Sequence, residues 1–288
     1  MSNAENKIKR ATGLLVIEVI NSNPNGDPDR ESDPRQRPDG KGEISPVSFK
    51  RKLRDLVEDK QGDVWRVLSE QLGLKLDEFA ILESRGRNRT TIKGELTNGL
   101  FQKKYWDGRV FGNTFLEEEM DKGTIKTGVV QMGLGVSIAP IDIERHTNTN
   151  KAGVEEGKTA GMAPMAYRFV QHGVYCMPFF VNPSMAHKSG CTAQDIEFMK
   201  KLIPHAYAHT RSHARPFVEI RHAWYCEHEN ALGSCSDFAI IDALKPTKIG
   251  EPNKPSTSGN DYSWPDIDKV KGDLKKKGVT CVDLVSQA

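Results

Sequence analysis

The sequence predicts an α+β fold, and three observations lead to this expectation. A β-branched apolar run spans residues 14–20, and a period-two apolar pattern spans 130–139. Helical apolar spacing follows at 45–57 and again at 192–209. With a further strand before the second helix and one after it, the order is βαββαβ. This is the ferredoxin-like plan of RNA-recognition (RRM) domains, so we expect an RRM-type palm.

The first strand, 14–20, leads into a segment rich in Pro, Gly, Asn and Asp that extends to residue 42. This composition excludes a helix and a central strand. A loop of about 22 residues far exceeds the usual connection of roughly 4–6, and loops of that length are usually functional or disordered.

The next element is a helix that begins with Ser45 as N-cap and Pro46 in its first turn. Its apolar residues recur at helical spacing and should face a sheet; they are Phe49, Leu53, Leu56 and Val57. Residues 63–82 also have helical spacing. We expect them to belong to a helical finger region inserted into the palm over 60–127.

The remaining elements are expected in the second half of the chain. The long strand 130–139 and a strand at 167–181 flank a polar, Gly-rich segment, which predicts an extended β-hairpin over 143–165. Pro204 should break or kink the helix 192–209. Strands are expected at 217–225 and 238–244, and a linker or covering tail at 246–288.

Composition narrows the classes of protein. The chain has 288 residues, 41 of them basic and 39 acidic, and a net charge of +2 alone does not indicate a nucleic-acid binder. No run approaches the roughly 18 apolar residues of a membrane span, and no signal peptide is recognisable. Five cysteines without a Cys-x-x-Cys pair predict reduced thiols. We expect a soluble, cytoplasmic protein with no membrane association.

Motifs for nucleotide binding, serine hydrolysis or zinc proteolysis are absent from the sequence. Two metal sites can be considered, but neither has the spacing of a known module, so we expect no metal and no cofactor. The first is the acidic loop with Asp27, Asp29, Asp33 and Asp39. The second combines His205, His209 and His213 with Cys226, His228 and Cys235.

Three basic clusters have the character of phosphate contacts. They are Lys50, Arg51, Lys52 and Arg54 on the first helix, Arg85, Arg87 and Arg89 after it, and Arg145, Lys151 and Lys158 on the hairpin. The first cluster can equally be an ordinary solvated helix face. Met162 and Met165 near the hairpin tip either pack against a neighbour or insert as wedges between bases.

Several motifs resemble one family. Asn23-Pro-Asn-Gly-Asp-Pro28 after the first strand, then Val47-Ser-Phe-Lys-Arg-Lys-Leu-Arg54, closely resemble the backbone subunit of type I CRISPR Cascade complexes, the Cas-seven family in its Csd/Csh branch. Three later stretches agree in order: Asp107-Gly-Arg-Val-Phe-Gly112, Val130-Gln-Met132 with Ser137, and His209-Thr-Arg-Ser212 with Arg215.

The resemblance implies a non-catalytic scaffold that polymerises head-to-tail along CRISPR RNA and contacts other Cascade subunits. The guide would pair with target DNA. The palm would occupy 12–245, with the finger at 60–127 and the hairpin 143–165 as a thumb. The resemblance adds RNA-contacting residues to the basic clusters: Asn23, Asn25, Arg109, Gln131, Ser137, Arg211 and Arg215. Two alternatives stay open: a metal-dependent RNA-cleaving subunit that uses an Asp of the 27–33 loop, and a protein-binding scaffold without nucleic acid.

Overall fold

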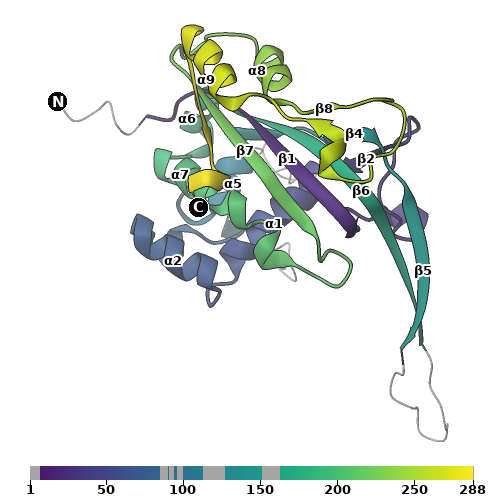
Figure 1. Cartoon of the computed structure of the whole chain (residues 1–288). Coiled ribbons are helices and arrows are strands. Elements are labelled where there is room, and N and C mark those ends of the chain that lie inside the picture. Colours follow the sequence, from purple (N-terminus) through teal and green to yellow (C-terminus); the bar gives the residue numbers. More distant parts are fainter. Residues whose placement is uncertain are drawn as a thin grey trace, which may run out of the picture.

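The computed structural model describes residues 7–84, 90, 94–95, 100–112, 127–150 and 163–287. Its centre is a large antiparallel sheet whose strands differ in length (Figure 1). The strand order along its main path is β10-β7-β1-β6-β4-β2, while β3 and β5 also pair with β6. The bounds are β1 Ala11–Ser22, β2 Lys41–Ile44, β3 Val130–Met132, β4 Gly135–Pro140, β5 Ile143–Asn150, β6 Ala163–Val181, β7 Val218–His228 and β10 Val279–Asp283.

Strand β1 is apolar throughout because both of its faces are covered. Leu15 and Ile17 belong to the core on one side of the sheet, whereas Leu14 and Val16 belong to a second core on the other side. Successive side chains of a strand point to opposite faces, so an unbroken apolar run places one set in each core.

The larger core lies between the sheet and an inner layer of helices. This layer contains α1 (Pro46–Glu58), α2 (Asp63–Leu72), α5 (Trp106–Phe111) and α7 (Ala193–Leu202). Shorter helical elements complete this side and the loops; they are η1 Pro28–Arg30, η2 Leu76–Glu78, α4 Phe101–Lys104, η4 Pro183–Met185, α6 Ala186–Ser189, η5 Ile203–His205 and η6 Ala208–Thr210.

Helix α1 confirms its expected start. The Ser45 side chain accepts a hydrogen bond from the N–H of Ser48 at 3.2 Å, and Pro46 occupies the first turn. The expected apolar stripe of this helix is buried. The helix expected over 63–82 is too long, because α2 ends where Gly73 adopts a left-handed φ of 61°. Helix α7 ends at Leu202, just before Pro204, as expected.

The second core lies under an outer layer of C-terminal elements. It contains α8 (Asp237–Leu244), α9 (Ile267–Lys276) and the small ladder of β8 (Thr247–Lys248) and β9 (Tyr262–Ser263). The strand expected at 238–244 is wrong, because this segment is helix α8. Ile240 and Leu244, one helical turn apart, are buried, whereas Phe238 is 78% exposed. This burial pattern follows the helical repeat rather than alternation.

The C-terminal segment differs from the expected linker or tail. Strand β10 pairs with β7 and forms an edge of the main sheet. Cys281 of β10 lies opposite Cys226 of β7, and the two form a disulfide. The expectation of reduced thiols is therefore wrong for this pair, whereas Cys176, Cys191 and Cys235 are free.

Two further strands differ from the sequence expectation. The strand expected at 130–139 is divided into β3 and β4 at Gly133, whose N–H bonds to the carbonyl of Pro178 at 2.8 Å. Strand β2 lies at the end of the segment expected to be a loop, and it pairs with β4. Its short, weakly apolar sequence carries no strong strand signal.

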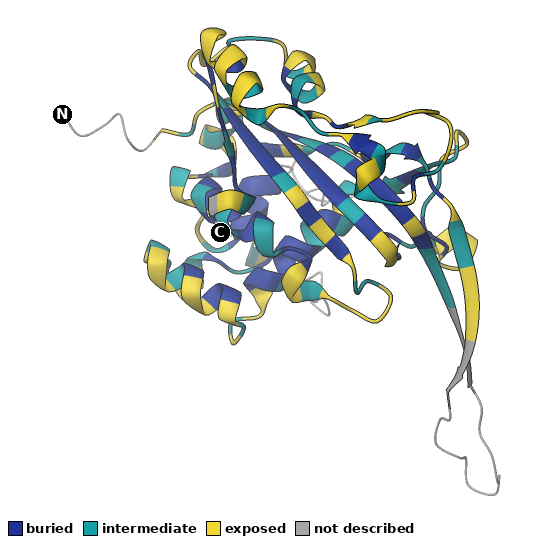
Figure 2. Cartoon of the chain, viewed as in Figure 1, coloured by how far each residue is buried: buried dark blue, intermediate teal, exposed yellow. Residues whose placement is uncertain are grey.

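Strand β5 and the first half of β6 form an antiparallel ribbon that projects away from the body (Figure 1). Its described residues have little cover from the helices, and Figure 2 shows β5 as mostly exposed. Among the described residues, no helix combines the length and apolar character needed to cross a bilayer.

Candidate nucleic-acid interface

The four cations of α1 do not form one exposed face. Lys52 and Arg54 are only 8% and 3% exposed. The Arg54 guanidinium lies 2.9 Å from Oδ2 of Asp107 and 3.1 Å from Oε2 of Glu83. Helix α1 turns these two cations toward the interior rather than toward solvent, and their expected phosphate contacts stay predictions.

Arg51 and Lys50 are only partly buried, but their surroundings differ. Arg51 forms ion pairs with Asp55 at 2.7 Å and Glu58 at 2.6 Å, and it donates to the carbonyl of Glu83. Lys50 Nζ lies 5.1 Å from the centre of the Phe111 ring. Burial lowers the pKa of Lys50. Unlike Arg51 and Arg54, Lys50 has no carboxylate within ion-pair distance among the described residues.

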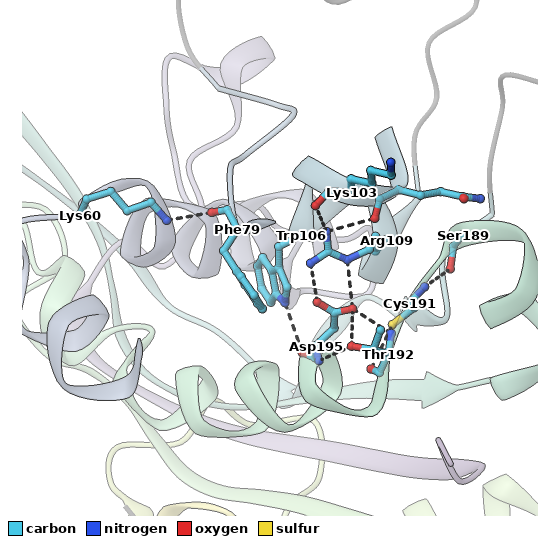
Figure 3. A network of polar contacts seen from close by, with 10 residues as sticks. Lys60, Phe79, Lys103, Trp106, Arg109, Ser189, Cys191, Thr192 and Asp195 are labelled. Carbon is cyan, nitrogen blue, oxygen red and sulfur yellow. Dashed lines mark hydrogen bonds and ion pairs between the residues drawn. The ribbon is translucent and has the colours of Figure 1, made fainter. Parts of the chain in front are cut away.

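Arg109 is also held inside the fold by an ion pair (Figure 3). Its guanidinium makes two contacts with the Asp195 carboxylate, at 2.7 and 3.0 Å, and Arg109 is 4% exposed. Asp195 simultaneously caps α7 through Thr192. The paired charges thus connect α5 to the start of α7; Arg109 is buried in this pair, and its expected RNA contact stays a prediction.

Asp107, the first residue of the Asp107–Gly112 motif, is likewise buried and paired with an arginine. It accepts hydrogen bonds from the N–H of Leu82 at 2.7 Å and from Arg54 at 2.9 Å. Asp107 and Asp195 were not among the sequence candidates. The regular Asp-x-Arg spacing was the available signal, but it does not distinguish an interior ion-pair motif from an RNA contact.

Three other residues that the resemblance assigns to RNA contacts differ in burial and in bonding. Asn25 Oδ1 accepts from the N–H of Ser45 at 2.7 Å and so supports the start of α1. Ser137 is 1% exposed, and its Oγ accepts from the N–H of Gly42 at 2.8 Å. Its hydroxyl is therefore buried and bonded within the sheet, and the expected RNA contact of Ser137 stays a prediction. Gln131 is exposed on β3.

Three loop or hairpin segments meet at the end of β1. The N–H of Asn23 bonds to the carbonyl of Ala214 at 2.7 Å, and Asn23 Nδ2 donates to the carbonyl of Ser32 at 2.8 Å. The N–H of Phe217 donates to Ser22 Oγ at 3.0 Å. These bonds join the 21–35 loop to the 209–217 loop beside the base of the β5–β6 hairpin.

Two arginines at the hairpin base face the same carboxylate. Arg145 of β5 hydrogen-bonds to Asp33, and Arg168 of β6 lies 3.4 Å from Asp33 Oδ1. Arg168 also pairs with Glu31. The hydrogen bond from Arg145 lowers the pKa of Asp33. Arg168 was absent from the sequence candidates, since a single arginine within an apolar strand carries no motif.

A cavity of about 350 Å³ lies next to these arginines. Its lining includes Asn23, Ser32, Tyr167, Arg168, Phe169 and His213. The rings of Tyr167 and His213 are 4.6 Å apart. Asn23 is 8% exposed, and its Oδ1 is buried without a hydrogen-bond partner among the described residues. Aromatic faces, the Arg168 guanidinium and an amide oxygen suit a nucleotide, and one carboxylate, Glu31, also lines the cavity.

The 209–217 loop contains the last two arginine candidates. Arg211 is exposed, whereas Arg215 is half-buried and its Nε has no hydrogen-bond partner in the structure. Arg215 shares a cavity of about 400 Å³ with Lys52 and His209. Three carboxylates line the same cavity, namely Asp55, Asp59 and Asp63. The mixed charge makes this cavity a weaker phosphate site than the hairpin base.

Several candidates lie outside the described residues: Arg85, Arg87, Arg89, Lys151, Lys158 and Met162. Met165 pairs with Asn148 in the β5–β6 ladder, but its side chain is outside the described part. Their roles therefore stay predictions.

Neither metal site considered from the sequence is assembled. Within the described ranges, no group of three His, Cys, Asp or Glu side chains could hold a metal ion. Asp27 caps η1 by accepting from the N–H of Asp29, and Asp33 pairs with arginines. Cys226 is committed to its disulfide.

Comparison with protein families shows to which family this chain belongs. The family model described as CRISPR-associated protein Cas7 matches residues 9–266. The chain belongs to the Cas7 family. The resemblance seen in the motifs is confirmed, and the Csd/Csh branch stays a prediction. The match extends past residue 245 into the outer layer, which the motifs had not reached.

Two solved structures are similar to this Cas7-family chain. A chain of a "CRISPR RNA-guided surveillance complex, pre-nicking" has a TM-score of 0.53 at 12% identity, with 93% of this chain and 89% of that chain covered. A chain of a "CRISPR RNA-guided surveillance complex" has a TM-score of 0.44 at 13% identity, covering 84% and 77%. No curated protein matches by sequence. The first likeness supports the shared fold.

Proposed function

We propose that this protein is an RNA-binding backbone subunit of a Cascade-type surveillance complex. In this role it coats CRISPR RNA and presents the guide for pairing with target DNA. The observation that carries the proposal is the Cas7 family match over residues 9–266. The similar structure over 93% of the chain comes from a CRISPR RNA-guided surveillance complex, which supports the same role.

An RRM-like palm is part of the proposal. The neighbours β7, β1, β6 and β4 are all antiparallel, and their order corresponds to the fourth, first, third and second strands of a βαββαβ unit. Helices α1 and α7 fill the two helix positions. The finger at 60–127 and the thumb at 143–165 would then be insertions into this palm.

The covered sheet argues for a particular RNA path. RRM domains stack bases on the free face of the sheet. Here α8, α9 and β9 cover that face, and Tyr262 of β9 and Leu274 of α9 are buried with Trp224 of β7 in the core between them and the sheet. We therefore place the RNA at the hairpin end of the sheet, beside the cavity lined by Tyr167 and His213, rather than on the sheet.

The groups at this end favour recognition of backbone and shape. Arg168, Arg145 and Arg211 can contact phosphates, which carry no sequence information. The aromatic lining of the cavity can stack on any base. A subunit that coats arbitrary guides needs such sequence-independent contacts. We further propose head-to-tail contacts between copies, because repeated identical heterologous contacts produce an open filament.

Catalysis is not part of the proposal. The alternative, metal-dependent RNA cleavage, needs a carboxylate of the 27–33 loop to be available to a metal. Asp27 caps a turn and Asp33 is held by two arginines; Asp29 is exposed, but among the described residues no group of three His, Cys, Asp or Glu side chains could hold a metal ion with it. We therefore favour the non-catalytic scaffold.

RNA binding and salt dependence test the proposal. Unrelated single-stranded RNAs of equal length should bind with similar affinity, and log K should fall linearly with log salt by about 0.7 per phosphate contact. In light scattering, the mass of the complex should increase with RNA length. A compact dimer that ignores RNA would contradict the proposal. Metal-dependent cuts in complementary RNA that Asp29→Ala abolishes would favour the enzyme.

A further inference from the structure

The positions of Arg145 and Arg168 are unfavourable without a third group. They lie directly opposite each other in the β5–β6 ladder. Like charges at such positions destabilise a strand pair. The Asp33 carboxylate approaches both guanidiniums and compensates for this repulsion together with Glu31, which pairs with Arg168 alone.

The loop that carries Asp33 is held in an unusual backbone conformation. Glu31 and Ser32 have φ angles of 49° and 67°, in the left-handed region that favours glycine. Backbone bonds stabilise the turn: the N–H of Asp33 donates to the carbonyl of Arg30 at 2.9 Å, and its carbonyl accepts from Asp27 at 2.7 Å. Such backbone persists only when the surroundings enforce it, and it is common at functional sites.

The location of this carboxylate suggests what it replaces. A carboxylate and a phosphate present the same pair of acceptor oxygens to a guanidinium. Arg168 contacts Asp33 and also lines the 350 Å³ cavity, where the buried Asn23 Oδ1 has no partner in the part of the chain that the structure describes. A strand with one nucleotide in this cavity would bring its phosphate near the two arginines.

We propose that Asp33 is an internal stand-in for a phosphate. In the free protein it orders Arg145 and Arg168, and on binding a backbone phosphate of the RNA takes its place between them. This inference rests on the proposed RNA-binding function. Each binding event breaks the contacts of Asp33, so this carboxylate lowers the affinity for RNA while it keeps the arginines in position.

The test is Asp33→Asn, which removes the charge and keeps the side-chain shape. We expect about fivefold tighter binding of a single-stranded RNA, the scale of one exposed ion pair. The log–log salt slope should become steeper by roughly 0.7 to 1.4, because one or two more counterions are released. Asp29→Asn is the matched control, with the same charge change at an exposed position of the same loop; it should change affinity less than about twofold.

A variant that lacks both arginines distinguishes the replacement of Asp33 by a phosphate from a general effect of removing a negative charge. In protein carrying Arg145→Gln and Arg168→Gln, the added Asp33→Asn should leave affinity unchanged. Equal or weaker binding by folded Asp33→Asn protein, or the same gain in the variant that lacks both arginines, would overturn the inference. If Asp33→Asn does not fold, the ¹⁵N signals of the two guanidiniums in the wild-type protein decide. They must shift when RNA is added, and unchanged signals at saturation would overturn the inference. Wild-type protein that binds no RNA would instead overturn the proposed function.

Discussion

Two groups of arginine–carboxylate pairs show how one chemistry takes two roles. Arg54 and Arg109 connect the inner helices, and their side chains are 4% and 5% exposed. Arg145 and Arg168 at the hairpin base have side chains that are 64% and 18% exposed. Both groups have partner carboxylates within hydrogen-bond or ion-pair distance, so pairing alone does not distinguish them.

Burial determines the difference between the two groups. A buried ion pair whose partner is removed leaves a charge that water cannot reach, which costs about 3–5 kcal/mol. An exposed pair contributes about 0–1 kcal/mol, because water and salt replace the lost partner. The inner pairs therefore belong to folding, whereas at the hairpin base Asp33 is 8% exposed but the Arg145 side chain is 64% exposed and can reach a ligand.

The largest expected effect tests the inner pairs. Arg109→Ala should lower the free energy of unfolding by about 3–5 kcal/mol, because Asp195 is left buried and unpaired. Urea unfolding followed by circular dichroism measures it. Arg211→Ala, at an exposed position, is the control and should change stability by less than about 0.5 kcal/mol. Similar values for the two variants would remove the contrast between the regions.

The second-largest expected effect concerns the disulfide between β7 and β10 at the edge of the sheet. Replacing Cys226 and Cys281 by serine together should lower the free energy of unfolding by about 2–4 kcal/mol, because the bond closes a loop over a sequence separation of 55. RNA affinity should stay the same, since β10 is at the sheet edge remote in strand order from β5. Dithiothreitol should destabilise the wild-type protein but not the double variant. Equal responses would show that the bond does not form in solution.

A smaller effect tests the hairpin base. Arg168→Gln should reduce the log–log salt slope of RNA binding by about 0.7, the value of one phosphate contact on a single strand. Stability should change by about 1 kcal/mol or less, because the Arg168 pairs are partly exposed. Fluorescence anisotropy at several salt concentrations gives the slope. A slope equal to that of the wild-type protein would place the RNA elsewhere.

The smallest effect concerns pH. Burial lowers the pKa of His228 below its ordinary value of 6.5. The unfolded chain therefore takes up a proton that the folded protein does not, so stability is full above pH 6.5 and falls as the pH decreases below it. Urea unfolding at pH 7.5 and pH 5.5 measures the loss. His228→Gln should show a weaker pH dependence over this interval, and an undiminished one would assign the effect to other groups.

Local patterns predicted part of the fold correctly. The start of α1 depends on Ser45 and Pro46, and its buried face depends on residue spacing, so neighbouring residues contain the information. Helix α8 was mistaken for a strand because its short apolar run fits both periods. Strand β10 was missed because its contribution depends on pairing with β7, more than 50 residues earlier.

The candidate site was predicted less completely than the fold. Asn23, Arg145 and Arg211 lie at the hairpin end, where the structure joins loops from three parts of the chain. Arg54, Arg109 and Ser137 were assigned to RNA from motifs but are buried. Arg168 and the cavity-lining Tyr167 and His213 were missed because no local pattern marks them.

The sequence by itself determined the family, the order of the main elements and the residues that form the apolar core. Only the tertiary structure decided which cations face solvent. Arg54 and Arg109 meet Asp107 and Asp195, which are 53 and 86 positions away, and Arg145 meets Asp33 at a separation of 112. Apolar burial follows a period of neighbouring residues, whereas the environment of a charge is set by partners that only the folded chain brings within a few ångströms.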